Sequence, residues 1–268
     1  MTEVNYLESL NPLQYESVCS TEGPNLIIAG AGTGKTKVLT TRVAHIIDNN
    51  LAFPSQILCV TFTNKAAREM SERVQKLVSQ NMEKMPWMGT FHSIGAKIIR
   101  NHAEVIGLKQ SFTILDKDDQ LSLIKQIIKA ENLDQSQFSP KLIQSKIDHW
   151  KNKALNPNDI KSESLDNLVD EKSLSIYKIY QARLFEINCL DFGDLLLQCI
   201  NLFKVPDIHK RYSNNFKYIH VDEYQDTNAA QYKWLKLLGS HHQNVCCVGD
   251  DDQSIYSWRG AEVDNMLR

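Results

Sequence analysis

Residues 25–36 read Asn-Leu-Ile-Ile-Ala-Gly-Ala-Gly-Thr-Gly-Lys-Thr, an apolar run that leads into a glycine-rich turn. The run predicts a buried strand, and the apolar spacing over residues 34–48 predicts a helix directly after the turn. Glycines in such a turn let backbone N–H groups converge on phosphate oxygens, and the helix N-terminus favours a bound anion. The sequence therefore predicts a phosphate-binding loop at this position.

The phosphate-loop pattern G-x-x-x-x-G-K-[ST] is met at every position except the first, which is Ala29. In this interpretation Lys35 contacts the β- and γ-phosphates of a nucleotide, and Thr36 is a ligand of Mg²⁺. The alternative is a tight turn whose lysine faces solvent. The residues expected to contact the nucleotide here are Ala29, Gly30, Ala31, Gly32, Thr33, Gly34, Lys35 and Thr36.

A second apolar run, residues 218–221, ends in the acid pair Asp222-Glu223. Two acids after a buried strand are typical of a Walker B arrangement. Asp222 would then hold Mg²⁺, directly or through water, and Glu223 would polarise the attacking water as a general base. The alternative is a strand that simply ends in two solvated acids. The phosphate loop earlier in the chain favours the Walker B interpretation over this alternative.

Apolar runs at residues 57–62, 87–91 and 245–248 predict three more strands, and continuous apolarity favours a parallel sheet covered on both faces. Between residues 94 and 203 the patterns are helical, and no strand is expected. We therefore predict an α/β domain formed by residues 1–93 and 200–268, with an all-helical insertion at 94–199.

Composition limits the class of protein. The chain has 268 residues, with 30 Lys+Arg against 32 Asp+Glu, and its hydrophobic share of 42% is ordinary for a globular protein. No stretch is strongly basic, so bulk charge neither indicates nor excludes nucleic acid. We find no membrane span or signal peptide, and none of the six cysteines forms a C-x-x-C pair. A cytoplasmic protein with reduced thiols is expected.

The last predicted strand is followed by Gln253, which would sense the γ-phosphate, and then by Tyr256, Trp258 and Arg259. Aromatic side chains beside an arginine can stack on bases and contact the backbone of a single strand. We expect Phe91 and Phe203, in contrast, to be core residues.

The motifs together resemble superfamily 1A DNA helicases of the UvrD/Rep/PcrA type. The resemblance covers essentially the whole chain, in the order found in that family. The similar segments are LNPLQ (10–14), residues 29–36, TFTNKAA (61–67), GTFHS (89–93), LDFGDLL (190–196), VDEYQDTN (221–228) and VGDDDQSIYSWRGA (248–261).

The resemblance implies a RecA-like phosphate-loop NTPase fold and an ATP-dependent 3′→5′ DNA helicase. ATP and Mg²⁺ would be its cofactors. Single-stranded DNA and duplex/single-strand junctions would be its partners, together with a second RecA-like lobe that this chain lacks. Gln14 would read the adenine edge, and Lys37 would lie near the base. DNA contacts would come from Phe62, Asn64, Thr90, His92, Phe192, Tyr256, Trp258 and Arg259.

Two positions depart from the family pattern. Gly193 stands where many relatives have Asp and is expected to loosen its turn, and Lys37 stands where Arg is common and loses the planar fork of a guanidinium. Without the second lobe and its arginine fingers, we expect this chain to bind ATP–Mg²⁺ weakly and to turn it over slowly.

Two other interpretations remain open. One is a non-catalytic ATP- or nucleic-acid-binding remnant or interaction module of a split helicase that retains the fold, and the other is a phosphate-loop ATPase or kinase unrelated to DNA. The sequence does not distinguish repair from replication, and it does not give the oligomeric state.

Overall fold

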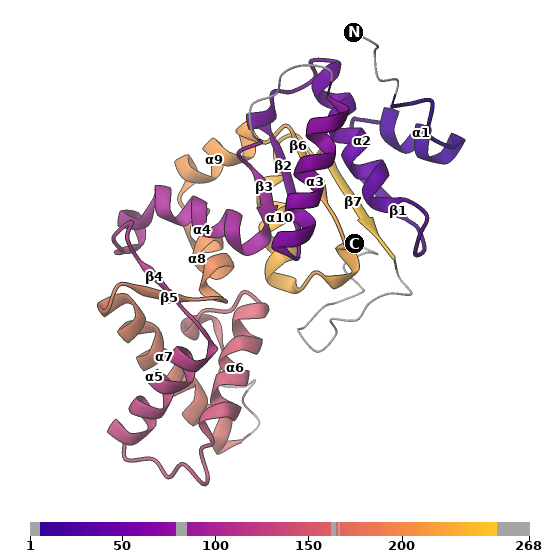
Figure 1. Cartoon of the computed structure of the whole chain (residues 1–268). Coiled ribbons are helices and arrows are strands. Elements are labelled where there is room, and N and C mark those ends of the chain that lie inside the picture. The colour runs from indigo at the N-terminus through magenta and orange to yellow at the C-terminus, as the bar shows by residue number, and fades with distance from the viewer. Residues whose placement is uncertain (1–5, 79–84, 162–164, 166, 251–268) are drawn as a thin grey trace. The chain divides into compact units, whose positions relative to one another are not determined.

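The computed structural model describes residues 6–78, 85–161, 165 and 167–250 (Figure 1). Contacts divide the chain, within these described residues, into two units. The described residues of the first unit are 6–78, 85–94, 205–227 and 235–250, and those of the second are 95–161, 165, 167–204 and 228–234. The domain boundaries expected from the sequence, 93/94 and 199/200, stay a prediction. None of the described helices is both long and apolar enough to cross a membrane.

The first unit is built on a five-stranded sheet in which every neighbouring pair is parallel. The strand order is β1-β7-β6-β2-β3, so β7 lies between β1 and β6. All five were predicted from their apolar runs. The expectation that β1 is buried is wrong, however, because β1 is an edge strand in which Leu26 and Ile28 are 43% and 54% exposed. The strands are β1 (Asn25–Ile28), β2 (Ile57–Thr61), β3 (Met88–Thr90), β6 (Tyr218–Val221) and β7 (Val245–Gly249).

Helices cover both faces of this sheet. On one face α2 (Lys35–Asp48) and α3 (Asn64–Leu77) pack together, and their buried side chains form one core with residues of β2 and β7 (Figure 1). On the other face Gly239, which follows α10 (Ala229–Leu238), lies against Val245 and Ile219. The expected α/β fold is confirmed. The remaining helices with residues in this unit are α1 (Pro12–Cys19), α4 (Phe91–Asn101) and α9 (Pro206–Asn215).

The second unit contains the helices expected for the insertion, and its core combines apolar residues of three of these helices with Phe138 and Cys189. It is not purely helical, however. Two three-residue strands, β4 (Thr113–Leu115) and β5 (Cys189–Asp191), pair in parallel. The expectation of no strand here is wrong because such short segments show no alternation that sequence reasoning could use. The helices are α5 (Lys117–Ala130), α6 (Pro140–Asn152), α7 (Leu168–Glu186) and α8 (Asp194–Leu202).

The start of α10 belongs to the second unit, which sequence reasoning did not anticipate. The buried indole N–H of Trp234 donates to Cys199 Sγ at 3.1 Å. The amide of Asn228 donates to Asn152 Oδ1 at 3.2 Å. These polar contacts explain why residues late in the sequence group with the insertion.

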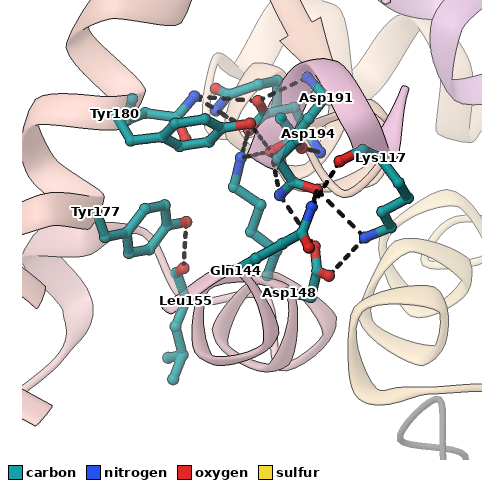
Figure 2. A network of polar contacts seen from close by, with 12 residues as sticks. Lys117, Gln144, Asp148, Leu155, Tyr177, Tyr180, Asp191 and Asp194 are labelled. Carbon is teal, nitrogen blue, oxygen red and sulfur yellow. Dashed lines mark hydrogen bonds and ion pairs between the residues drawn. The ribbon is translucent and has the colours of Figure 1, made fainter. Parts of the chain in front are cut away.

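A buried ionic network connects the helices of the second unit (Figure 2). The ammonium of Lys151, on α6, lies 2.7 Å from Asp191 Oδ2 and 2.9 Å from Asp194 Oδ1, and its side chain is fully buried. Tyr180, on α7, donates to Asp191 Oδ2 at 2.9 Å, and the amide of Gln181 donates to Asp194. One lysine thus compensates two acids that flank the turn between β5 and α8.

The two acids respond differently to this environment. Burial opposes ionisation of Asp191, but the charge of Lys151 and the hydrogen bonds from Lys151, the Asp194 N–H and Tyr180 together lower the pKa of Asp191. For Asp194, burial and then the charge of Asp191 raise the pKa against the pull of Lys151. Loss of the lysine would destabilise the folded state, because it leaves buried acidic groups without their cation.

Gly193, between the two acids, has a helical backbone with φ of −66° rather than a left-handed one. A Cβ atom at this position would lie 2.9 Å from Lys151 Cδ and 3.0 Å from Lys151 Cβ. The glycine thus makes room for the stem of the buried lysine. Whether Gly193 also loosens its turn, as expected from the sequence, stays a prediction.

We predict that Lys151→Met lowers the free energy of unfolding by about 3–5 kcal/mol, because it leaves Asp191 and Asp194 buried without a cation. Urea unfolding followed by circular dichroism would measure the loss. Lys153→Met is the matched control, since Lys153 is exposed two residues further along. Equal stability of the two variants would contradict the structural importance of the network.

Candidate functional site

The glycine-rich loop after β1 adopts the backbone that its sequence predicts. Gly32 and Gly34 have φ of 73° and 89°, a left-handed conformation that favours glycine. Gly34 is the N-cap of α2, so the first residues of that helix, Lys35 and Thr36, directly follow the turn. The residues between Gly30 and Thr33 are exposed, which leaves the loop accessible to an anion.

Lys35 folds back over this loop. Its ammonium donates to the carbonyl oxygens of Ala29 at 2.9 Å and Gly30 at 3.2 Å. It also forms an ion pair with Asp250 Oδ2 at 3.0 Å, in which the Lys35 and Asp250 side chains are only 9% and 2% exposed. Solvation of Lys35 in an exposed turn, the alternative considered from the sequence, is therefore wrong.

The carboxyl ends of three neighbouring strands meet at this position. β1 leads into the loop, β7 ends just before Asp250, and β6 ends just before Asp222. The N–H of Ala29 donates to Gly249 O at 3.0 Å, which extends the pairing of β1 and β7 to the start of the loop. Ligands of open parallel sheets bind at this edge, outside the carboxyl ends of the strands.

Asp222 lies in this group with its side chain almost fully buried. Burial and then the charge of Glu223 raise the pKa of Asp222 to about 6, against the backbone N–H of Glu223 and the charges of Lys35 and Arg73. The charge of Lys35 favours the ionised form of Asp222, and the strand order places the lysine's loop and the acid pair at the same edge of the sheet. A buried carboxylate of raised pKa is a suitable oxygen ligand for a divalent cation.

Glu223 has a strained backbone, with φ of 53° and ψ of 46°. A left-handed conformation at a residue other than glycine costs of order 1–3 kcal/mol and is concentrated at functional sites. The Glu223 carboxylate accepts a hydrogen bond from Gln225 Nε2 at 2.6 Å. Gln225 in turn accepts the N–H of Asp250 on its Oε1 at 3.0 Å, so one buried amide connects the two strand ends.

The helix that precedes β1 contributes to the same loop. Gln14 donates from Nε2 to Thr33 O at 2.9 Å and accepts the N–H of Asn11, which caps α1. The ammonium of Lys37 donates to Ser9 O at 2.6 Å. Both residues therefore connect the N-terminal segment to the loop, and their expected roles at the nucleotide base stay predictions.

The expected DNA-contacting residues fall into separate groups. In the first unit, the half-buried ring of Phe62 packs 5.4 Å from the buried ring of Phe91, which is a core residue as expected. Asn64 is exposed at the start of α3, and His92 is half-buried. The hydroxyl of Thr90 accepts the N–H of Ser93 at 3.2 Å, so this buried residue caps α4.

In the second unit, Phe192 is 51% exposed at the turn between β5 and α8. With Leu115, Lys117 and Gln120 it lines a hollow of about 350 Å³. Gln253, Tyr256, Trp258 and Arg259 lie outside the described residues.

Sequence reasoning missed Asp250 and Gln225 as members of the site. Both stand in segments that carried the family resemblance, but neither was given a role. The signal was present, because Asp250 stands two residues after the apolar run 245–248 and Gln225 stands four residues after the run 218–221. Recognising that Asp250 and Gln225 belong to one site required the strand order, which places the end of β7 beside the end of β6.

The parallel sheet, the loop after β1 and the acids after β6 and β7 define the chain as a phosphate-loop α/β protein. The sequence model of the UvrD/REP helicase N-terminal domain matches residues 10–268. The chain belongs to this family.

Curated relatives agree with this assignment. DNA helicase II of Rickettsia typhi is 50% identical over 100% of this chain and 41% of its own length. A probable DNA helicase II homolog of Rickettsia felis is 49% identical over 98% of this chain and 40% of its own length. The ATP-dependent DNA helicase PcrA of Staphylococcus aureus is 49% identical over 97% of this chain and 36% of its own length. The chain thus spans about two fifths of these relatives.

We predict that Asp222→Asn stabilises the chain at pH 7.5 in the absence of nucleotide and metal. The pKa of Asp222 is raised, so the ionised carboxylate destabilises the folded state above its ordinary titration range, by roughly 2–3 kcal/mol at neutral pH. The isosteric amide removes this cost, and most of the gain should be lost near pH 4, where Asp222 of the folded chain is protonated. Urea unfolding at the two pH values measures it.

Asp207→Asn is the control, since Asp207 is an exposed acid of the same unit. An Asp222→Asn variant that is less stable than the parent at pH 7.5 would show that Asp222 is a structural acid rather than a strained functional one.

Proposed function

We propose that the chain is the nucleotide-binding part of an ATP-dependent DNA helicase and that it binds ATP with Mg²⁺ at the loop after β1. The observation that carries this proposal is the convergence of Lys35, Asp250 and Asp222 at the carboxyl ends of three adjacent parallel strands. A lysine beside a glycine-rich loop suits phosphates, and a buried carboxylate of raised pKa suits a metal ion.

The residues of this chain fit the cofactors in chemical type. Lys35 would contact the β- and γ-phosphates, with the backbone of residues 29–34 around them, and Gln14 and Lys37 would lie at the base. Thr36 and Asp222 would hold Mg²⁺ through hard oxygen ligands. When bound, Mg²⁺ neutralises charge on the phosphates. Glu223 would orient and deprotonate the attacking water, and Gln253 would sense the γ-phosphate.

We further propose that single-stranded DNA is the partner, held by stacking and backbone contacts. Phe192 supports this proposal as an exposed aromatic residue at an apolar hollow, a suitable platform for a base. The other proposed contacts are Phe62, Asn64, Thr90, His92, Tyr256, Trp258 and Arg259. Unwinding of duplex junctions in the 3′→5′ direction, a second RecA-like lobe as partner and a cytoplasmic location belong to the same proposal. The names of the relatives, DNA helicase II and ATP-dependent DNA helicase PcrA, support its helicase part alone.

We predict that changes at the two sites separate nucleotide binding from DNA binding. Lys35→Ala should abolish binding of a fluorescent ATP analogue and leave binding of a labelled oligonucleotide intact. Phe192→Ala should do the opposite, weakening oligonucleotide binding by about 1–3 kcal/mol through the loss of one stacked base. Trp258→Ala is expected to behave like Phe192→Ala. Fluorescence anisotropy measures both ligands.

Lys76→Ala and Phe53→Ala are the controls, since both residues are exposed and outside the proposed sites. Circular dichroism would verify the fold of Lys35→Ala, which leaves Asp250 without this cation. Equal loss of both activities in each variant would contradict the separation. Binding of neither ligand by the parent chain would favour an interaction module, and nucleotide binding without DNA binding would favour an ATPase unrelated to DNA.

A further inference from the structure

The ammonium of Lys35 has no hydrogen-bonding capacity to spare. It carries three N–H donors, and its three acceptors are Ala29 O, Gly30 O and Asp250 Oδ2. A phosphate oxygen can therefore reach Lys35 only if one of these acceptors leaves. The structure thus contains a state in which the central cation of the loop is fully engaged by the protein itself.

Asp250 is the acceptor that a phosphate would replace. It is the only anion among the three acceptors, so it neutralises the charge of Lys35 as a phosphate would. The two carbonyl oxygens, in contrast, belong to the backbone of the loop. Asp250 is 2% exposed, and once separated from Lys35 its carboxylate would be a buried charge facing an anionic ligand. Nucleotide binding and the Lys35–Asp250 pair therefore oppose each other.

The backbone of Asp250 is connected to Glu223 through one side chain. Gln225 accepts the N–H of Asp250 at 3.0 Å and donates to the Glu223 carboxylate at 2.6 Å, and it is 1% exposed. A buried amide with both ends engaged cannot shift at one end without disturbing the other. A displacement of Asp250 would therefore also move the hydrogen-bond donor of the Glu223 carboxylate.

We propose that Asp250 is an internal counter-ion of the phosphate loop, which holds Lys35 until a nucleotide phosphate displaces it, and that Gln225 is a positioning residue that transmits this displacement to Glu223. The proposal rests on the proposed function, because it requires a nucleotide at this loop. It adds a competitor for the lysine and a connection between phosphate binding and the acid that would activate water.

The test compares the parent chain with Asp250→Asn, using an ATP analogue that carries a methylanthraniloyl fluorophore on its ribose. The amide still accepts a hydrogen bond from Lys35 but carries no charge, so the competition is weakened. We expect Asp250→Asn to bind the analogue about tenfold more tightly, with and without Mg²⁺. Without nucleotide, its thermal midpoint should fall by a few degrees, because the ion pair is lost. Asp207→Asn should change neither quantity.

Each other outcome has a distinct meaning. Weaker binding together with lower stability would show that Asp250 is only structural and would overturn the proposal. Weaker binding confined to solutions with Mg²⁺ would make Asp250 a metal ligand and would also overturn it. Failure of the parent chain to bind the analogue, with its fold intact, would refute the proposed function itself, and the lower thermal midpoint of Asp250→Asn would still be measurable.

The role of Gln225 is tested by a double-mutant cycle. Asp250→Asn and Glu223→Gln are combined, and their effects on analogue affinity should be non-additive by threefold or more. The same cycle in a Gln225→Ala background should be additive within error. Non-additivity of the same size without Gln225 would show that the two acids interact directly and would refute the transmitting role, as would additive effects in the parent chain.

Discussion

Parallel pairing of β1 with β7 and of β7 with β6 is the constraint on which the site depends. The carboxyl ends of parallel strands lie at the same edge of a sheet, so parallel pairing alone brings together residues that follow three different strands. Lys35, Asp250 and Asp222 come from distant parts of the sequence, yet they need only the correct strand order to meet. The helices on both faces and the apolar strands make that order stable, and the polar residues beyond the strand ends provide the chemistry.

The site is arranged at a cost to the folded state. Asp222 is buried beside another acid, Glu223 has a left-handed backbone, and Lys35 is shielded from solvent. Two of these features are partly compensated by neighbours, because Asp250 pairs with Lys35 and the charges of Lys35 and Arg73 favour the ionised form of Asp222. The second unit solves a similar problem differently, because the acids around Lys151 are paired with that lysine and with Tyr180 and Gln181 of the protein itself. Protein groups pair with the acids of the structural cluster, whereas the proposed functional cluster would be completed by a nucleotide and a metal ion.

The sequence was enough to predict the elements that have a continuous local pattern. It was not enough to predict features that depend on residues far apart in the chain. The five strands of the sheet, the phosphate loop and the acid pair each have a continuous pattern, so they were predicted close to their observed bounds. β4 and β5 were missed because three residues carry too little pattern, and the pairing joins Thr113 to Cys189. Asp250 and Gln225 were missed for a related reason: their importance comes from the adjacency of β6 and β7. The packing of Gly193 against Lys151 likewise depends on two helices meeting.

The position of β7 also governs when the sheet can form during synthesis. Among the described residues, β1 pairs only with β7, and the two are separated by the entire second unit and most of the first. On the ribosome, residues 95–204 can collapse from contiguous sequence while β1 still has two unpaired edges, because its neighbour has not been made. The nascent chain thus leaves β1 unpaired until residues 245–249 have been synthesised, and the nucleotide loop acquires its shape only after that.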